Sequence, residues 1–424
     1  MRKTYQYKLI LTAVQRQKIE HCLDMLRCQY NYLLSERFNW WEYNRSYLVI
    51  PQGEYCLRWC ELGGIELKDN PDWHSQSASL PQLKKDRPWY SDIYSQVLQD
   101  CVKRVKLTFE RFLKGDSKGN RSGKPRYKNR ARYRTLTYPS IADKNLMGSR
   151  IKLPKLGVLK FRKSKNIEPK FKLKTASITR KADGYYLMLS VEDKTIPEVK
   201  LDTVPTEANT TGIDVGLSAL YFDSNNNQAL PQKHLRKSES KLASLQRKLE
   251  DNARSRKAKK LIRQAIARLH QKIARQRKDW HYVESHKVAR NCRVLAIEDL
   301  KIRNMKRRNK PKKVDGNFVP NGQSASSGMN KSWSDNGVAK FLEILSQVAQ
   351  KYGTRIVKVN PKGTSQHCSR CLSRVSKDLS DRWHKCDSCN LSIDRDYNSA
   401  LLIKKLAVGS SQSKKLPSLK NLLS

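Results

Sequence analysis

Apolar and polar residues in the first quarter of the chain follow a strand pattern and then a helix pattern. Residues 4–12 (TYQYKLILT) alternate well enough to predict an opening strand. From Ala13 onward, apolar side chains recur at spacings of three and four, and residues 91–114 repeat this period with a second apolar face. Glycine and proline interrupt the stretch between them. The pattern therefore predicts a helical unit over residues 13–115, which follows the opening strand.

The next segment changes to a strand pattern. Residues 115–134 are rich in glycine, serine and arginine and have no period, which is typical of a basic loop. Short alternating stretches follow over 134–195. Between two of them, Asp183 and Gly184 predict a tight hairpin, because this pair supplies positive φ angles. We expect a small barrel or sheet here that the opening strand joins, with the helical unit inserted between.

From Thr211 onward, predicted strands alternate with predicted helices, which indicates a mixed α/β domain. The predicted strands are TGIDVGL, CRVLAIEDL (292–300) and RIVKVN, and the predicted helices cover 234–290, 338–351 and 397–406. The helices of 234–290 carry Lys and Arg on their remaining faces, which suits either a solvated hairpin or one that contacts nucleic acid. Residues 301–335 predict a mobile loop, and residues 408–424 predict a tail without fixed structure.

The net charge of the chain indicates a class of binding partner in addition to the fold. The 424 residues include 86 Lys and Arg against 39 Asp and Glu, a formal net charge of +47. Solubility alone asks for a magnitude of about 2–8 in a small domain. A polyanion neutralises such a charge, and nucleic acid does so with release of condensed counterions. The sequence therefore favours a nucleic-acid-binding protein of two to four domains.

A membrane partner is the rival explanation of the charge. No apolar run approaches the roughly 18 residues that span a bilayer, and no lipidation motif or cleavable leader is found. We therefore expect no membrane partner and a cytoplasmic protein. The chain also has no Gly-x-x-x-x-Gly-Lys-Ser/Thr phosphate-binding loop and no nucleophilic Ser-His-Asp or Cys-His arrangement.

Four of the ten cysteines form two closely spaced pairs near the C-terminal end. Cys368 and Cys371 are followed after fourteen residues by Cys386 and Cys389. Two such pairs place four thiolates around one tetrahedral Zn²⁺ with no open position. The sequence therefore predicts a structural zinc site, in which His367 and His384 are neighbours rather than ligands.

Carboxylates occupy three apolar strand or turn contexts of the α/β region. Asp214 lies in TGIDVGL and Glu298 in VLAIEDL, while Asp394 and Asp396 lie in SIDRDYNSALLI. A carboxylate in a buried strand is costly unless something compensates its charge. Mg²⁺ does so with oxygen ligands and substrate phosphate, whereas ion pairs with Arg or Lys are the simpler alternative. The shared context favours a magnesium centre for phosphodiester chemistry.

These motifs, taken in their order along the chain, resemble a known family. GIDVGL, AIEDL and GTSQHCSRC…CDSC…DRDYNSA are similar to the motifs of TnpB, the RNA-guided nuclease of insertion sequences, which is related to the compact type V CRISPR effectors. In the N-terminal half, YKLILTAVQRQ…YNYLL, SQVLQD…FERF and GKPRYK also resemble that family. The resemblance extends over nearly the whole chain and is most specific from 211 to 405.

The resemblance implies a multidomain α+β architecture. A wedge-type β-barrel interrupted by a helical recognition lobe would precede a RuvC-type RNase H-like α/β nuclease domain with an inserted zinc ribbon. In this sequence the implied boundaries are 1–12 and 116–205 for the wedge, 13–115 for the helical lobe, 206–360 and 391–407 for the nuclease domain, and 361–390 for the ribbon. The segments 36–90 and 301–335 are longer than the family pattern, so the resemblance does not indicate their structure or role.

The resemblance also implies an activity, its cofactors and its partners. It implies Mg²⁺-dependent cleavage of double-stranded DNA paired to a bound guide RNA, beside a short flanking motif, in a prokaryotic cytoplasm. Asp214, Glu298 and Asp396 would be the catalytic acids, and Gln99 and Thr137 would contact the flanking motif. A transposase that performs strand transfer and a guided repressor without cleavage are the alternatives, because three acids do not separate hydrolysis from transesterification.

Overall fold

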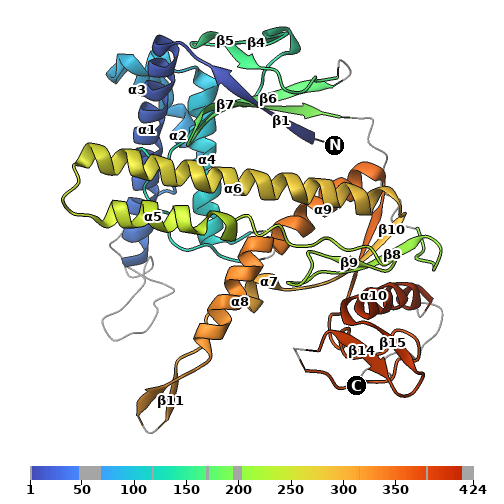
Figure 1. Ribbon diagram of the computed structural model, residues 1–424. Coiled ribbons are helices and arrows are strands. Elements are labelled where there is room, and N and C mark those ends of the chain that lie inside the picture. Colours follow the sequence, from blue (N-terminus) through green and yellow to red (C-terminus); the bar gives the residue numbers. More distant parts are fainter. Residues whose placement is uncertain are drawn as a thin grey trace, which may run out of the picture. The chain divides into compact units, whose positions relative to one another are not determined.

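The structure is a computed structural model that divides into two compact units, residues 1–194 and 195–424, each taken here by itself (Figure 1). Part of the 36–90 region and the end of the predicted tail lie outside the described residues. The structure describes residues 2–46, 68–116, 119–168, 171–193, 203–314, 316–378 and 381–412.

A seven-stranded antiparallel sheet forms one part of the first unit. Its order is β2-β6-β7-β1-β5-β4-β3. The opening strand β1 pairs with β7 on one side and β5 on the other, so the prediction that it joins the sheet is confirmed. The strands are β1 (Arg2–Ile10), β2 (Thr135–Tyr138), β3 (Leu146–Met147), β4 (Arg150–Leu153), β5 (Gly157–Arg162), β6 (Lys172–Lys181) and β7 (Gly184–Glu192).

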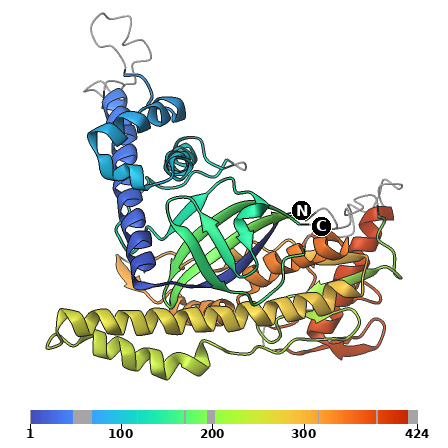
Figure 2. The same ribbon diagram turned by 90° about the horizontal axis from the view of Figure 1, so that it is seen from above.

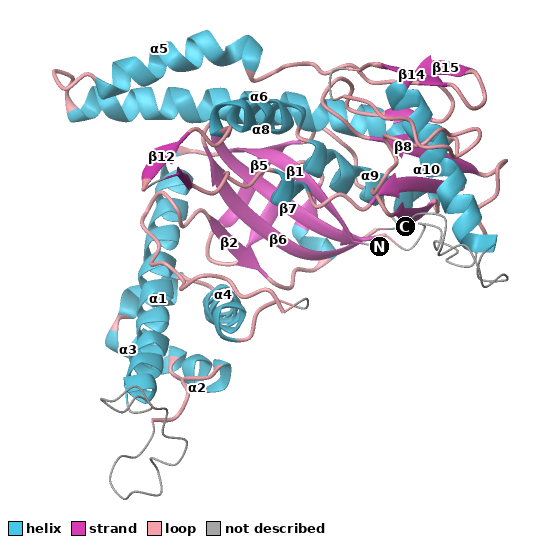
Figure 3. Ribbon diagram, turned by 90° about the horizontal axis from the view of Figure 1, so that it is seen from below, coloured by secondary structure: helices cyan, strands magenta, loops and turns pink. Residues whose placement is uncertain are grey.

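The sheet is strongly curved but does not close by hydrogen bonding in the described ranges (Figure 3). Strand β2 pairs with β6 and strand β3 with β4, which leaves these two as the edges of the sheet. The predicted hairpin joins β6 to β7 through Ala182 and Asp183, and its positive φ is at Gly184 (+130°). Of the two alternatives from the sequence, the described strands therefore form an open sheet rather than a closed barrel.

The helices inserted between β1 and β2 share a hydrophobic core with the sheet. Helix α1 packs on α4, and both bury apolar residues in the cluster that holds Tyr7 and Leu136 of the sheet. The predicted helix 91–114 begins later, at Ser95, because a 3-10 turn over Pro88–Asp92 precedes it. The helices are α1 (Ala13–Ser46), α2 (Trp73–Ala78), α3 (Leu80–Asp86) and α4 (Ser95–Leu113). The insertion in sequence thus forms one core with the sheet around it.

The second unit is built on a four-stranded mixed sheet of order β13-β10-β8-β9. Strands β8, β10 and β13 are parallel, and β9 is antiparallel to β8. All five residues of β10 are buried, as expected for a central parallel strand covered on both faces. The strands are β8 (Thr210–Asp214), β9 (Phe222–Asp223), β10 (Val294–Glu298) and β13 (Arg355–Val359). The predicted mixed α/β region is confirmed.

Helices α9 (Val338–Tyr352) and α10 (Arg395–Gln412) cover opposite faces of this sheet. Leu295 and Ile297 of β10 pack with Phe341 of α9, whereas Ala296 between them packs with Ile403 of α10. Successive residues of a strand point to opposite faces, so this alternation assigns the two helices to the two sides. The α10 side therefore also receives Gly212 and Asp214 from β8 and Glu298 from β10.

Two long basic helices lie antiparallel beside each other, as the sequence predicts (Figure 2). They are α5 (Glu239–Glu250) and α6 (Arg256–Arg290). None of the described helices is both long and apolar enough to cross a membrane.

The prediction of a mobile loop over 301–335 was wrong. The segment folds into α7 (Ile302–Met305), β11 (Lys312–Val314), β12 (Asn317–Val319) and α8 (Gln323–Asn336). Its Asn, Ser and Gln side chains bond to backbone groups, and only its two ends bury side chains in the core.

The end of the last helix also differs from the prediction. Helix α10 continues past the predicted end at 406 to Gln412, because Ala407 and Val408 are buried against the unit. The first residues of the tail predicted from Val408 are therefore helical, and residues 413–424 lie outside the described residues.

Candidate functional site

Two of the predicted acids end adjacent parallel strands. Asp214 is the last residue of β8 and Glu298 the last residue of β10. Ile213 pairs with Ile297, so the two acids follow at the same level of the sheet. Both strands run in the same direction, and the carboxyl ends of parallel strands meet at one edge. The fold therefore brings together two side chains that are more than eighty positions apart in the sequence.

The third acid, Asp396, lies in the first turn of α10, the helix that covers the same face of the sheet. The Asp394 Oδ1 accepts the backbone N–H groups of Asp396 (2.7 Å) and Tyr397 (3.1 Å). Asp394 therefore acts as the helix cap, the role for which a short carboxylate is preferred. Its side chain is thereby occupied, which leaves Asp396 as the acid of this motif that faces the strand ends.

The electrostatics of Asp214 show that the three acids are neighbours. Burial raises the pKa of Asp214 well above its usual value, and the charges of Glu298 and then Asp396 raise it further, while Arg395 opposes this. Burial also raises the pKa of Glu298. Like charges at one site disfavour ionisation of each other. A cation at this position would relieve both the burial and the repulsion.

Ion pairs with Arg or Lys, the simpler alternative, do not compensate these acids. In the described ranges neither Asp214 nor Glu298 has a salt bridge, and Asp396 has one contact of 4.0 Å with Arg382. The acids are nonetheless spread more widely than the ligands of a single closed site. Among the described residues, only the four cysteines form a group of three or more candidate ligands with all donor atoms within 4.8 Å of one another.

Three polar side chains position the acids, two by bonding to a carboxylate and one by bonding to the loop after Asp214. Ser218 Oγ lies 2.6 Å from Asp396 Oδ2, and the buried Thr364 hydroxyl lies 2.5 Å from Glu298 Oε1. The amide of Asn336 donates to the carbonyl oxygens of Gly216 (3.3 Å) and Leu217 (3.2 Å), just after Asp214. Thr364 lies inside the quoted GTSQHCSRC motif, whereas Ser218 and Asn336 carried no signal in the sequence.

Gly212 sets the distance between β8 and the helix that carries Asp396. A Cβ at this position would lie 2.2 Å from the Ala400 carbonyl oxygen and 2.6 Å from the Lys404 nitrogen, both backbone atoms of α10. We expect Gly212→Ala to destabilise the protein by about 1–3 kcal/mol, because the helix must move away from the strand. Thermal unfolding measures this. Gly409→Ala in the same helix is the control, since its added Cβ meets nothing within 4 Å, and equal melting temperatures for the two variants would contradict the prediction.

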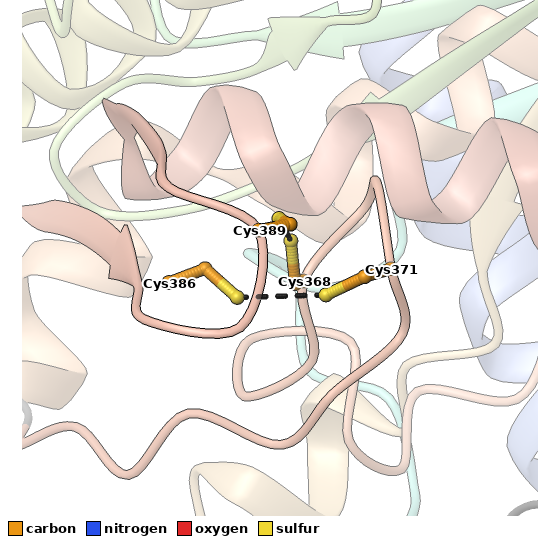
Figure 4. A group of neighbouring side chains, drawn as sticks. All are labelled: Cys368, Cys371, Cys386 and Cys389. Carbon is orange, nitrogen blue, oxygen red and sulfur yellow. Dashed lines mark hydrogen bonds between the residues drawn. The ribbon is translucent and has the colours of Figure 1, made fainter.

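The four predicted cysteine ligands converge in the second unit (Figure 4). The sulfurs of Cys368 and Cys389 lie 3.5 Å apart, as do those of Cys371 and Cys386. Tetrahedral Zn–S bonds of about 2.3 Å place sulfurs roughly 3.8 Å apart, so the cluster fits zinc. The residue after each cysteine pair, Leu372 or Asn390, has a positive φ of 66° or 55°, which turns both knuckles tightly.

The surroundings of the cysteines separate ligands from neighbours. Hydrogen bonds from Ser373 lower the pKa of Cys371 to about 6, which favours the thiolate that a metal needs. His367 Nδ1 lies 2.9 Å from the Gly363 carbonyl oxygen, and His384 is buried on β14 (Trp383–Cys386). Neither histidine belongs to the cluster, as predicted. Strand β15 (Leu391–Asp394) pairs with β14 and continues directly into α10.

The two predicted DNA-contact residues lie on neighbouring elements of the first unit. Gln99 is exposed on α4, and Thr137 is half-buried on β2, which α4 contacts. The Thr137 hydroxyl accepts a hydrogen bond of 2.6 Å from Arg104, whose Nε pairs with Asp100 at 2.7 Å. Their role as contacts to a flanking motif stays a prediction.

Sequence models of known families match three separate parts of the chain. The model described as "Probable transposase" matches residues 187–309, and the model described as "Cas12f1-like, TNB domain" matches 339–403, which contains the four cysteines and Asp396. A model described as "Helix-turn-helix domain" matches 1–46. Here that segment consists of β1 and the uninterrupted helix α1 over the described residues.

Individual proteins resemble the chain over similar stretches. A protein of Escherichia coli (strain K12), provisionally named RNA-guided DNA endonuclease InsQ, is 29% identical over 318 residues, which are 74% of each chain. A TnpB-like protein of Acanthamoeba polyphaga mimivirus is 28% identical over 38% of this chain and 28% of its own. Among solved structures, the Cas12f1–guide RNA–target DNA complex matches with a TM-score of 0.33 and 16% identity over 95% of this chain and 99% of the other.

Proposed function

Because this chain belongs to the TnpB family, we propose that it is an RNA-guided DNA endonuclease that cleaves phosphodiesters at the acids of its second unit. One observation carries the proposal. Asp214, Glu298 and Asp396 come from three distant parts of the chain, and the fold brings them to one edge of the sheet, where the charges of Glu298 and Asp396 add to burial in raising the pKa of Asp214. Burying Asp214 and Glu298 without a salt bridge to any described residue costs stability, which a purely structural role does not explain.

The acids are suited to hold divalent cations against a phosphodiester. Carboxylate oxygens are the ligands that Mg²⁺ prefers, and a pair of ions about 4 Å apart is served by a wider set of oxygens than one ion. When bound, Mg²⁺ supplies charge stabilisation and a more acidic water for hydrolysis. The chain's own contribution is positional: Ser218 holds Asp396, Thr364 holds Glu298, and Asn336 holds the loop after Asp214.

The proposed domains follow from this assignment. The second unit would be a RuvC-type RNase H-like nuclease domain over 206–360 and 391–407, with the ribbon 361–390 inserted and one structural Zn²⁺ on its four cysteines. The first unit would be the wedge, with the helical lobe 13–115 inserted, and Gln99 and Thr137 would contact a short motif beside the target. The mixed sheet with acids at one edge and the cysteine cluster support this arrangement.

Guide RNA and target double-stranded DNA are the proposed partners. In RNA-guided recognition, base pairing selects the sequence, and the protein holds the heteroduplex by its backbone. A net charge of +47 suits several nucleic-acid strands packed closely together.

The decisive experiment uses the protein purified with the RNA that accompanies it. The RNA is sequenced, and duplexes that match or mismatch its guide segment are incubated with the complex and Mg²⁺. We expect cleavage of the matched duplex only, and none after chelation of divalent metal. Joined products without guide dependence would favour the transposase. Binding of matched DNA without cleavage by either the wild type or Asp214→Ala would favour the repressor.

Thr364 provides a prediction about the metal response. In Thr364→Val the Glu298 carboxylate loses its hydroxyl donor, and burial then raises the pKa of Glu298 without that opposition. We expect cleavage to fall about 10–100-fold and half-saturation to need more Mg²⁺, because outer partners of metal ligands typically contribute this much.

The serine variant provides the control for Thr364. Thr364→Ser keeps the hydroxyl and should recover most of the activity and of the Mg²⁺ response, which titrations of cleavage rate against Mg²⁺ measure. Equal loss in the valine and serine variants would show that packing, rather than the hydrogen bond, is what matters.

A further inference from the structure

Residues 302–314 and 316–336 form a projecting arm on the second unit. Helix α8 leads away from the sheet and carries the β11–β12 hairpin at its far end (Figure 1). The side chains of the hairpin are mostly exposed, and the arm becomes buried only at its two ends, at Ile302 and at Trp333, Asp335 and Asn336.

Hydrogen bonds hold the basic strand of the arm along α8. Asn309 donates its backbone N–H to Gln323 Oε1 (2.9 Å) and its side-chain amide to the Asn321 carbonyl oxygen (2.7 Å). Nearer the core, Lys306 Nζ lies 2.7 Å from Ser334 Oγ. The arm is therefore a defined surface with a fixed order of side chains.

The root of the arm is joined to the candidate active site. Asp335 accepts the backbone N–H of Leu235 (2.9 Å), and Asn336 donates to the carbonyl oxygens of Gly216 and Leu217. These two carbonyls follow Asp214 by two and three positions. The root of the arm is thereby held against the loop that follows Asp214.

The charged side chains of the basic segment 301–314 have one sign. From 301 to 314 the sequence contains eight cations and no acid: Lys301, Arg303, Lys306, Arg307, Arg308, Lys310, Lys312 and Lys313. All but Lys306 are exposed. Such a stripe of basic side chains is typical of a surface that binds a polyanion.

The hairpin adds an exposed aromatic ring to this stripe. Phe318 on β12 is 71% exposed, the highest value among the large apolar side chains that the structure describes, and Lys313 Nζ lies 4.6 Å from its ring centroid. An exposed ring between phosphate-binding cations is the arrangement by which proteins stack nucleic-acid bases. A duplex keeps its bases stacked inside, so the ring is suited to a single strand.

We propose that the arm binds the single-stranded DNA segment that enters the active site, with Phe318 stacked on a base and Lys312 and Lys313 on the adjoining phosphates. The identity of the strand rests on the proposed function. The surface itself rests on the exposed ring, the cationic stripe and the contacts of Asn336 with the loop after Asp214.

The test measures binding of a fluorescent oligothymidylate to the RNA complex of Asp214→Asn, so that the probe is not cut. In this background Phe318→Ala should weaken binding about 5- to 150-fold, the range that stacking of one base is worth. Phe318→Trp should retain the affinity. Leu230→Ala is the matched control, because Leu230 is an exposed apolar residue of the same unit outside the arm. Lys312→Ala with Lys313→Ala should reduce the slope of log affinity against log salt by about 1.4.

The outcomes separate the arm from the proposed function. Unchanged affinity in Phe318→Ala, photo-crosslinking of the arm to the guide RNA instead of the probe, or binding of the arm to anionic vesicles but not to the probe would each overturn the inference. Loss of probe binding in Phe318→Ala, together with no guided cleavage by the protein with Asp214 intact, would support the arm and reject the proposed function.

Discussion

Asp214→Asn should abolish guided cleavage and, in the metal-free protein, raise the melting temperature. Cleavage should fall at least about a thousandfold, because metal-assisted charge stabilisation is worth several kcal/mol and each 1.36 kcal/mol is tenfold in rate. Stability should rise because the substitution removes a buried carboxylate that Glu298 and Asp396 repel. A residue that is costly to the fold but needed for activity is typical of functional sites.

The stability difference between Asp214→Asn and the wild type should depend on pH. The folded-state pKa of Asp214 is raised, so its protonated form contributes stability at acid pH, and this contribution is lost as the pH rises through the folded-state pKa. Without metal, the melting temperatures of Asp214→Asn and wild type should therefore diverge from acid toward neutral pH. Mg²⁺ should reduce the difference. Scanning fluorimetry with and without Mg²⁺ measures both.

Asp223→Asn on the neighbouring strand β9 is the matched control. Asp223 is also buried, but its Oδ1 accepts the backbone N–H groups of Asn225 (2.9 Å) and Asn227 (2.8 Å). Its replacement should lower the melting temperature and leave the Mg²⁺ dependence of cleavage unchanged. A melting temperature of metal-free Asp214→Asn below that of the wild type, or retained cleavage, would contradict the interpretation of the acids as a metal centre.

Removal of zinc should have the second largest effect. We expect one zinc per chain, and its chelation or the variant Cys371→Ser should unfold the segment around β14 and β15, because structural zinc contributes about 10–16 kcal/mol of apparent binding free energy to such sites. Cleavage should be lost as well, since β15 continues into the helix that carries Asp396. RNA binding should remain, because most of the cationic surface lies elsewhere.

Hydrogen exchange locates this unfolding, and elemental analysis counts the metal. We expect faster exchange over 361–394 and unchanged exchange in the first unit. Cys28→Ser is the control, since Cys28 is an exposed free thiol of that unit. Full activity in a Cys371→Ser protein without zinc would contradict a structural role for the cluster.

The sequence predicted the residues that carry the chemistry of the site, but not the polar residues that hold them in place. Asp214, Glu298 and the four cysteines stand out because a charge in an apolar strand and two paired thiol motifs are both unusual in local context. The polar partners Ser218 and Asn336 did not stand out, since single hydroxyl and amide residues in loops are common. Only the fold, which aligns the ends of β8 and β10 and caps them with α10, makes these residues neighbours.

The prediction for 301–335 failed for a related reason. Composition equates Gly, Ser and Asn with disorder because such segments bury little apolar surface. Here Asn309 and Asn321 bond to backbone groups of the opposite strand, and a few buried residues at the ends anchor the rest. Such side-chain-to-backbone bonds depend on which segments meet, and no periodicity in the sequence records them.

The direct junction between β15 and α10 constrains the number of residues between the zinc ligands and the acid on the helix. Cys389 and Asp396 are separated by a strand and the start of a helix with no linker between them. A helix turns by about 100° for each residue, so one inserted or deleted position here would swing the carboxylate away from the strand ends. Relatives can therefore lengthen the ribbon at its distal loops, whereas the count from the last cysteine to the acid should remain constant.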